Sequence, residues 1–387
     1  MKLSMLAEKK FTEVDKFNIL RLFRCENVGP KTFYSLLDYF GSAENALEMI
    51  PEISKQGGLR RGIKVPPAEV IEQEIEMVAK FNAKHIFAND ILYPSGFKPK
   101  HDFPPVFTAK GNVAELNKYQ FVGIVGSRDS SENGNLIARE AGKSFADMGI
   151  AVVSGMAKGI DAAAHSGCLP FYNIAVLAGG LDNVYPPENK ELYEKICEFG
   201  LVISEQPLGS QPLAKHFPQR NKLIAGLADC LLVVEAAAKS GSLITANITK
   251  TLGRKVFAVP GSPMDRRASG TNQLIKAGDA ELFSRPENII EYLNSKKEVA
   301  MADSHKNSGY YVSTKLVPNE GDLVKFRDVI LEKLSYTPTP VENVIISSQI
   351  PASIANFLLL ELELAGKIER SFGNKVALVA STVEWGD

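Results

Sequence analysis

Short apolar runs recur along the middle of the chain and alternate with longer amphipathic segments. The first run begins at Phe121 and ends in a glycine turn, and the others cover residues 150–153, 173–178, 201–204, 230–235 and 255–259. Segments long enough for helices lie between them, for example residues 132–148 and 189–199. Runs buried on both faces that alternate with helices are typical of a doubly wound parallel α/β sheet. We therefore expect a ligand site at the carboxyl ends of the strands.

The pattern before this region predicts a separate helical domain over residues 1–82. Helical spacing on both sides of the turn at Gly29-Pro30-Lys31 resembles a helix-hairpin-helix or SAM-like unit. In such a unit the amides at Gly29 and the Lys31 cation would meet a DNA phosphate. An ordinary α-hairpin that stops at Gly-Pro explains the same residues equally well. After this domain we expect a strand at residues 85–88 and then a loop-rich segment over residues 93–112, which leads into the central sheet.

The pattern after residue 293 predicts a linker over residues 294–321 and a small domain over residues 322–387. Apolar spacing gives three helices at 323–334, 341–347 and 353–365, followed by two strands at 367–371 and 375–379. This order is typical of a winged helix. The third helix is acidic and apolar, whereas a helix that reads the major groove is basic and polar. A packing or protein-contact role is therefore favoured for it. Residues 83–293 remain as the central α/β domain.

Composition and charge narrow the class of protein. The chain has 387 residues, 45% of them hydrophobic, and a net charge of -1, which excludes a generally basic DNA-coating protein but permits a local basic patch. Its four cysteines form no C-x-x-C pair, which argues against a structural zinc or a disulfide framework. We expect no cofactor and no metal. The sequence shows neither a signal peptide nor an apolar run of about 20 residues, so we expect a cytoplasmic protein without a membrane span.

Candidate chemistry gathers where the predicted strands end. Ser127 and Arg128 follow the first strand in a glycine turn that matches neither the dinucleotide nor the P-loop fingerprint. Ser154, Gly155 and Lys158 follow the second strand. A glycine turn with a hydroxyl and a cation beside a helix start suits an anionic oxygen.

The helix after the second turn carries Asp161 and His165, four residues apart and therefore on one face. A metal or general-base role is conceivable for the pair. Local bonding for the carboxylate and a buried, satisfied imidazole is favoured, because no third ligand or nucleophile accompanies them.

The segment 217–227 carries the densest set of candidate residues. Pro218 suits the first position of a helix, and the first turn is then filled by Gln219, Arg220, Asn221 and Lys222. Cations there oppose the positive end of the helix dipole, so a bound anion is expected to relieve the repulsion. Phe217 suits either stacking on a base or, more simply, a place in the core.

A further turn of the same kind contains Gly241, Ser242 and Thr245. A single nucleotide does not need so many phosphate-type turns along one rim, whereas a polynucleotide backbone does. Binding should then weaken with salt, with a log-log slope of roughly −0.7 per phosphate neutralised on a single strand.

Five segments resemble the DNA-processing protein A (DprA/Smf) family as an ordered set. They are GSR at 126–128, VSGMAKGIDAAAH at 153–165, FPQRNKLIAGL at 217–227, SGSLITA at 240–246 and VPG at 259–261. The resemblance implies an extended Rossmann-like domain that binds single-stranded DNA without sequence preference. It also implies a homodimer without enzymatic activity that loads the recombinase RecA during natural transformation. The DNA pocket would be lined by Ser127, Arg128, Lys158, Arg220, Asn221, Lys222, Gly241, Ser242 and Thr245.

Two other functions are compatible with parts of this pattern. Nucleotide-cleaving phosphoribohydrolases on a similar sheet carry P-G-G-x-G-T-x-x-E, but residues 239–247 here lack the paired glycines and the glutamate. A duplex-binding regulator that acts through the winged helix is the weaker alternative. Free-base release from nucleoside monophosphates, and the relative affinities for single and double strands, distinguish these hypotheses.

Overall fold

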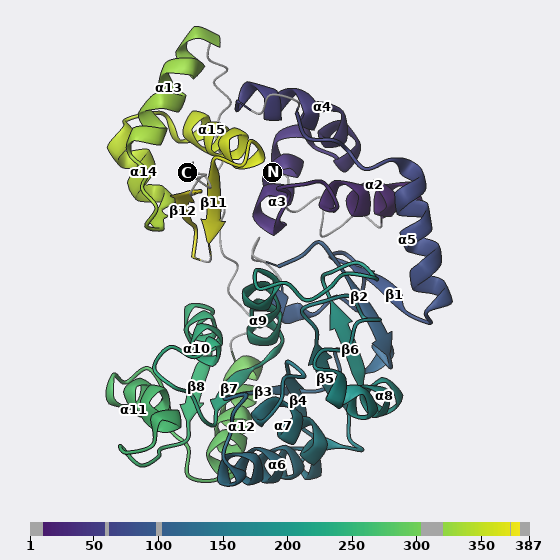
Figure 1. The fold of residues 1–387 in the computed structure, drawn as a ribbon, viewed down its shortest axis with the longest axis vertical. Helices are drawn as coiled ribbons and strands as arrows, with labels where there is room; N and C mark the ends of the chain where they lie inside the picture. Colours follow the sequence, from purple (N-terminus) through teal and green to yellow (C-terminus); the bar gives the residue numbers. More distant parts are fainter. Residues whose placement is uncertain (1–10, 59–61, 98–102, 303–319, 372, 380–387) are drawn as a thin grey trace, which may run out of the picture. The chain divides into compact units, whose positions relative to one another are not determined.

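The computed structural model describes residues 11–58, 62–97, 103–302, 320–371 and 373–379. The chain divides into two compact units (Figure 1). The central unit contains residues 73–307, and the terminal unit combines residues 1–72 with residues 308–387. The division into domains at residues 82, 293 and 321 stays a prediction.

The central unit is built on a sheet that has nine strands within the described residues, in the order β1-β2-β6-β5-β4-β3-β7-β8-β9. The strands are β1 (Lys84–Phe87), β2 (Val106–Gly111), β3 (Phe121–Val125), β4 (Ala151–Ser154), β5 (Asn173–Val176), β6 (Leu201–Ser204), β7 (Cys230–Val233), β8 (Lys255–Ala258) and β9 (Glu281–Leu282). The strands from β6 to β9 in this order pair in parallel. This confirms the doubly wound α/β prediction.

One edge of the sheet differs from the prediction. Strand β2 lies in the region expected to be a loop, and it pairs antiparallel with both β1 and β6. Its first four side chains are buried, so burial stabilises a strand directly after Pro104 and Pro105, residues that punctuate the sequence like a loop.

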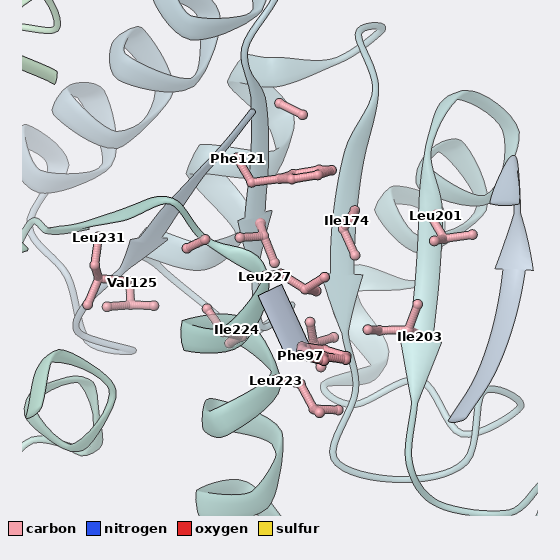
Figure 2. Packing of buried hydrophobic residues seen from close by; sticks show 14 of the residues in the cluster. Phe97, Phe121, Val125, Ile174, Leu201, Ile203, Leu223, Ile224, Leu227 and Leu231 are labelled. Atoms are coloured by element: carbon pink, nitrogen blue, oxygen red, sulfur yellow. The ribbon is translucent and has the colours of Figure 1, made fainter. Parts of the chain in front are cut away.

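Helices cover both faces of this sheet. They are α5 (Ala68–Lys80), α6 (Glu132–Asp147), α7 (Ile160–Cys168), α8 (Lys190–Phe199), α9 (His216–Leu227), α10 (Gly241–Thr251), α11 (Ser269–Lys276) and α12 (Glu287–Ala302). Side chains of β3 alternate between the two cores: Phe121 and Val125 face one, and Val122 and Ile124 face the other. The first core includes Leu223, Ile224 and Leu227 of α9 (Figure 2). Burying one such side chain stabilises the fold by roughly 1.5–3 kcal/mol, which fixes α9 against the sheet.

The terminal unit joins the two ends of the chain. Its helices are α2 (Glu13–Phe23), α3 (Pro30–Phe40), α4 (Ala43–Gln56), α13 (Glu320–Glu332), α14 (Val341–Ser348) and α15 (Ala352–Leu364). The strands β10 (Thr339–Pro340), β12 (Lys375–Leu378) and β11 (Ile368–Ser371) form a small sheet in that order. The winged-helix prediction is confirmed, and α12 extends to residue 302, into the segment expected to be a linker.

Helix α15, the third helix of the winged domain, packs against the N-terminal helices. The Asn27 amide donates to the carbonyl of Leu364 at 3.2 Å, and the Tyr39 hydroxyl donates to that of Ser353 at 2.9 Å. Glu361 of α15 is fully buried and pairs with Arg327 at 2.7 Å. These contacts confirm the packing role expected for this acidic, apolar helix.

The N-terminal hairpin turn contributes to the same contact. The Lys31 ammonium donates to the carbonyl of Ser371 at 3.2 Å. This intrachain bond uses one of the three donors of the ammonium group, so the phosphate-clamp interpretation of the turn stays a prediction. Among the described residues no single helix is long and apolar enough to cross a membrane; α14 and α15 reach that length only as a pair bent by 119°.

Candidate nucleic-acid interface

A cleft of about 470 Å³ opens at the carboxyl ends of β3 and β7. The chain continues from β3 to β4 on one side of β3, whereas β7 pairs with its other side, so the strand order reverses at this point. Ligands of open α/β sheets bind in the crevice at such a switch point. The wall of the cleft includes Ser127, Arg128, Asp129, Asp161, Phe217, Arg220, Asn221, Lys239, Ser240, Gly241, Ser242, Ile244 and Thr245.

The start of α10 forms one wall of the cleft. The Ser240 hydroxyl caps this helix by accepting the Ser242 amide at 3.3 Å, and the Ser242 hydroxyl donates to the carbonyl of Gly126 at 2.8 Å. The second bond ties α10 to the turn after β3. The first turn of α10 contains no acidic residue, so its positive dipole end is available to an external anion.

The start of α6, which follows the same turn after β3, is occupied by a carboxylate of the protein itself. Glu235 accepts the Ser131 amide at 2.9 Å and the Ser131 hydroxyl at 2.5 Å. An added Cβ at Gly134 would lie 2.6 Å from the Glu235 carboxyl carbon, so the helix start fits closely around this group. In many doubly wound folds the first helix after a glycine turn holds the nucleotide phosphate. In this chain the Glu235 carboxylate occupies the place of that phosphate.

Helix α9 begins earlier than its sequence suggests. It starts at His216, so Pro218 is its third residue and Arg220 its fifth. Lys222 is accordingly the seventh residue. The prediction that these cations fill the first turn is therefore wrong, and the dipole argument for a bound anion does not apply, because the dipole acts within the first turn.

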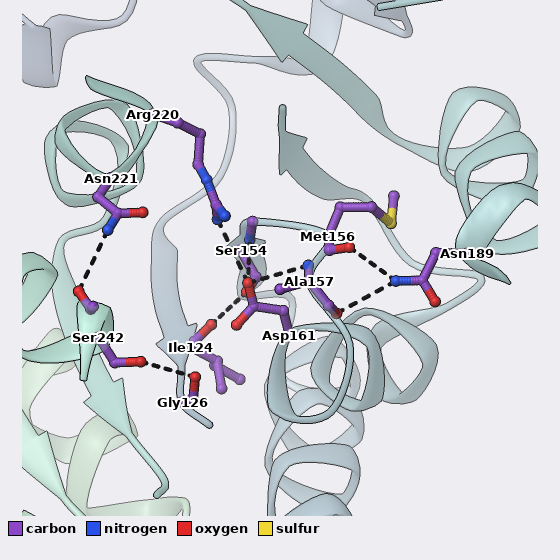
Figure 3. A network of polar contacts seen from close by, with 12 residues as sticks. Ile124, Gly126, Ser154, Met156, Ala157, Asp161, Asn189, Arg220, Asn221 and Ser242 are labelled. Carbon is purple, nitrogen blue, oxygen red and sulfur yellow. Dashed lines mark hydrogen bonds and ion pairs between the residues drawn. The ribbon is translucent and has the colours of Figure 1, made fainter. Parts of the chain in front are cut away.

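Arg220 is nevertheless directed at the cleft from inside the protein. Its side chain is 7% exposed, and Nη1 lies 3.5 Å from Oδ2 of Asp161 (Figure 3). An added Cβ at Gly155 would lie 1.1 Å from the same nitrogen, so the arginine fits only because this position is a glycine. Burial lowers the pKa of the guanidinium, Asp161 opposes this shift, and the charge of Arg128 adds to it. An arginine remains charged under such shifts.

Phe217 forms an aromatic edge beside the two guanidinium groups. The Arg128 guanidinium carbon lies 4.8 Å from the Phe217 ring centroid, and that of Arg220 lies 5.8 Å from it. The Tyr185 ring meets Phe217 edge to face, with centroids 6.4 Å apart. Phe217 is half-buried and borders the cleft and a smaller hollow beside it. It therefore belongs to the wall of the cleft, and the core role favoured from the sequence is wrong.

The turn after β4 does not offer its donors to a ligand. Ser154 is fully buried, and its hydroxyl donates to the carbonyl of Ile124 at 2.5 Å. The amides of Gly155 and Ala157 donate to Asp161 Oδ2 at 3.2 and 3.4 Å (Figure 3). The expectation that Ser154 and the amide of Gly155 bind phosphate is therefore contradicted, because the protein itself satisfies these groups.

The other predicted residues lie at different distances from the cleft. Lys158 borders the smaller hollow and makes an exposed ion pair with Glu188 at 2.6 Å. Asn221 lines the cleft, and its amide donates to the carbonyl of Gly241 at 3.4 Å. Gln219 and Lys222 are half-buried and border neither hollow. Their contact with a ligand stays a prediction.

His165 is fully buried, as the sequence favoured, and its Nδ1 lies 3.0 Å from Oδ1 of Asn173. The expectation of a satisfied imidazole holds for this nitrogen alone, because Nε2 has no hydrogen-bond partner among the described residues. Burial lowers the pKa of His165 to about 4, so the imidazole is neutral at pH 7. Asp161 bonds locally, as expected, but its pairing with Arg220 was not foreseen. Tyr185 and Glu235 were also missed, and only the long turn of residues 178–187 pointed to the former.

These features define a class: an α/β protein with a cationic, aromatic-edged cleft at the switch point of its sheet, flanked in sequence by a helical hairpin and a winged helix. The model of the DNA recombination-mediator protein A family matches residues 84–294. Models of the DprA-like N-terminal HHH domain and of the DprA winged helix domain match residues 13–77 and 317–374. The chain belongs to the DNA recombination-mediator protein A family.

Relatives and solved structures agree with this assignment. Protein Smf of Synechocystis is 30% identical over 383 residues, which span 90% of this chain and 95% of that protein. The X-ray structure of DNA processing protein A from Streptococcus pneumoniae superposes with a TM-score of 0.60 at 31% identity, covering 73% of this chain and 98% of that one. A DNA processing protein A structure from Helicobacter pylori, described for its single-stranded DNA binding mode, gives 0.51 at 27% identity, covering 55% and 97%.

Proposed function

We propose that the chain binds single-stranded DNA without sequence preference in the cleft at the switch point. Arg128 and Arg220 hold phosphate oxygens, and the start of α10 holds a neighbouring phosphate. The observation that carries the proposal is the pair of guanidinium groups at 4.8 and 5.8 Å from the Phe217 ring, beside a helix start without a carboxylate. Guanidinium groups bind phosphate oxygens in pairs of hydrogen bonds, and an aromatic edge suits an unpaired base.

The aromatic residues favour a single strand over a duplex. Phe217 is half-buried and Tyr185 is 50% exposed, so part of each ring is accessible to a base. In a duplex the bases are stacked on one another and do not reach a side chain in this way. Stacking on an aromatic ring contributes roughly 1–3 kcal/mol per base and tolerates any sequence. The Helicobacter pylori relative, which is described for its single-stranded DNA binding mode, supports the same choice.

We extend the proposal to the cellular role that the family implies. The chain acts in the cytoplasm as a homodimer, and it loads RecA on the bound strand during natural transformation. Membership of the recombination-mediator family supports this role. The test is RecA filament assembly on single strands coated with single-strand-binding protein, with and without this chain. Assembly that is no faster in its presence would contradict RecA loading and leave the DNA site untouched.

The DNA site itself is tested with fluorescent oligonucleotides. Affinity for a single strand, for the matching duplex and for nucleoside monophosphates is measured by anisotropy over a range of salt concentrations. We expect the single strand to bind best, with log affinity falling linearly with log salt. Equal affinity for the duplex would favour a duplex-binding regulator. Free base released from the monophosphates would favour the nucleotide-cleaving enzyme.

A further inference from the structure

Asp161 holds together the parts of the cleft that come from different elements. It is the second residue of α7 and is 5% exposed. Its Oδ2 accepts the amides of Gly155 and Ala157 and lies 3.5 Å from Nη1 of Arg220. One carboxylate oxygen thus joins the turn after β4 to the arginine of α9.

Arg220 depends strongly on this carboxylate. Its Nε is buried and has no hydrogen-bond partner among the residues that the structure describes. The charge of Arg128 acts on it unfavourably. A buried cation that loses its counter-ion is strongly destabilised, so without Asp161 the guanidinium is expected to leave its place beside Phe217 and turn toward water.

The turn after β4 is held from its other side as well. The Asn189 amide donates to the carbonyls of Met156 and Ala157 at 2.8 and 3.3 Å. Met156 adopts a positive φ of 59°, a strained conformation for a side chain of this kind. The conformation of the turn is therefore fixed by its hydrogen bonds to Asp161 and Asn189 rather than by the backbone preference of its residues. In this conformation Gly155 leaves the space that the Arg220 guanidinium occupies.

We propose that Asp161 is a positioning residue for DNA binding, which fixes the 154–158 turn and thereby holds Arg220 in the geometry that receives a phosphate. This inference rests on the proposed function. It makes a counterintuitive claim, because Asp161 is an anion at the edge of a site for an anion. If only the charge of Asp161 matters, removing the carboxylate should strengthen DNA binding. If Asp161 positions Arg220, removing the carboxylate should weaken DNA binding.

The test uses Asp161→Asn in the full-length chain, because asparagine keeps the shape and loses the charge. We expect affinity for a fluorescent single strand to fall about tenfold, or about 1.4 kcal/mol, although the cleft becomes more positive by one charge. The matched control is Glu188→Gln, which removes an exposed carboxylate from its ion pair with Lys158. On charge alone this control should bind DNA as tightly as the wild type or more tightly.

A double-mutant cycle separates positioning from a general loss of structure. In an Arg220→Ala background, Asp161→Asn should cause no further loss of DNA affinity, because the group it positions is gone. Asp161→Glu keeps the charge and moves the carboxylate by one methylene, so it should also weaken binding. It replaces Asp161→Asn in the test if the latter fails to fold by circular dichroism.

The outcomes distinguish this inference from the proposed function. If Arg220→Ala binds single strands as well as the wild type does, the proposed function fails for this cleft. If Arg220→Ala weakens binding but the Asp161 variants bind as well as the wild type or better, Asp161 is not a positioning residue and the proposed function stands. An additive loss in the double mutant would likewise overturn the positioning role.

Discussion

The central cleft and the terminal unit both contain residues that, in sequence, resemble DNA-binding motifs. In the cleft, Arg128 and the start of α10 line a hollow of about 470 Å³ between the described residues. In the terminal unit, Lys31 of the hairpin turn bonds to the winged domain, and α15 is buried against the N-terminal helices. The difference teaches that a motif predicts a binding site only where its donors are not already used within the protein.

The same contrast holds between neighbouring turns of the central unit. The turn after β4 resembles a phosphate-binding turn, but Asp161 and the carbonyl of Ile124 use its donors. The turn therefore contributes to a DNA site only indirectly. Gly155 leaves space for the guanidinium of Arg220, and Asp161, which the turn holds by two amides, is the counter-ion of that group. Glycine residues in such turns serve the packing of the protein as well as the approach of a ligand.

The two units are expected to differ most in their response to acid. All five histidines of the chain lie between residues 73 and 307, so the sequence of the terminal unit contains none. The pKa of His165 falls from its ordinary 6.5 to about 4 in the folded protein. The unfolded chain therefore binds the proton first as pH falls, and stability present above pH 6.5 is lost between pH 6.5 and 4. The loss is on the order of 3 kcal/mol.

Denaturant unfolding of the full-length chain at pH 7 and pH 4.5 measures this effect. His165→Gln should lower stability at pH 7 but remove part of the acid sensitivity. Other groups titrate in the same range, so the difference between wild type and variant is the quantity to compare. An acid response that is identical in both would show that the imidazole does not carry it.

Removing both guanidinium groups should produce the largest loss of DNA binding. Arg128→Ala combined with Arg220→Ala is expected to weaken single-strand affinity at least a hundredfold, about 2.7 kcal/mol. The salt slope should fall by roughly 1.4, because two phosphate contacts are lost. The measurement is anisotropy over a salt series. Lys143→Ala with Arg285→Ala removes the same charge from exposed positions outside the cleft and should change affinity little.

A single methyl group at Gly155 should separate geometry from charge. In Gly155→Ala the new Cβ would lie 1.1 Å from Nη1 of Arg220, so the guanidinium must move although no charge is lost. We expect about a tenfold loss of single-strand affinity, measured in the same assay. The control is the same change in an Arg220→Ala background, where the new methyl group meets no guanidinium and should cause no further loss of affinity. An equal loss in both backgrounds would refute the role of Gly155 as space for Arg220.

The smallest effect on DNA binding is expected in the terminal unit. Lys31→Ala should change single-strand affinity less than twofold, because its ammonium bonds to the carbonyl of Ser371. Tyr39→Phe removes a hydrogen bond to Ser353 and should cost about 1 kcal/mol of stability, again without a change in affinity. A loss of affinity in Lys31→Ala comparable to that of the cleft variants would restore the phosphate-clamp interpretation and remove the contrast between the units.

Much of the fold follows from local patterns in the sequence. The run at residues 201–204 coincides with β6, and the predicted helices and strands of the winged domain lie within three residues of their observed limits. These elements can be predicted because the apolar positions and turn residues that define them lie close together in the sequence. Strand β2 was missed because it pairs with β6, which lies almost a hundred residues further along the chain.

The site was predictable to a different degree. The turns at Ser127 and Gly241 were found because glycine, hydroxyl and cation stand together in the sequence. The pairing of Asp161 with Arg220, which lie 59 residues apart, leaves no trace in local spacing. The buried hydroxyl of Ser154 looks the same in sequence as an exposed one, because only the packing of the strands decides which donors remain available.

The terminal unit has a consequence for how the protein is made. Its two parts meet through residues as distant as Asn27 and Leu364, which are 337 positions apart in the chain. At roughly 5–20 residues per second, the N-terminal helices leave the ribosome on the order of tens of seconds before their packing partner exists. During that interval their apolar surface needs another cover, so a nascent chain arrested after the central unit should be a better chaperone substrate than the finished protein.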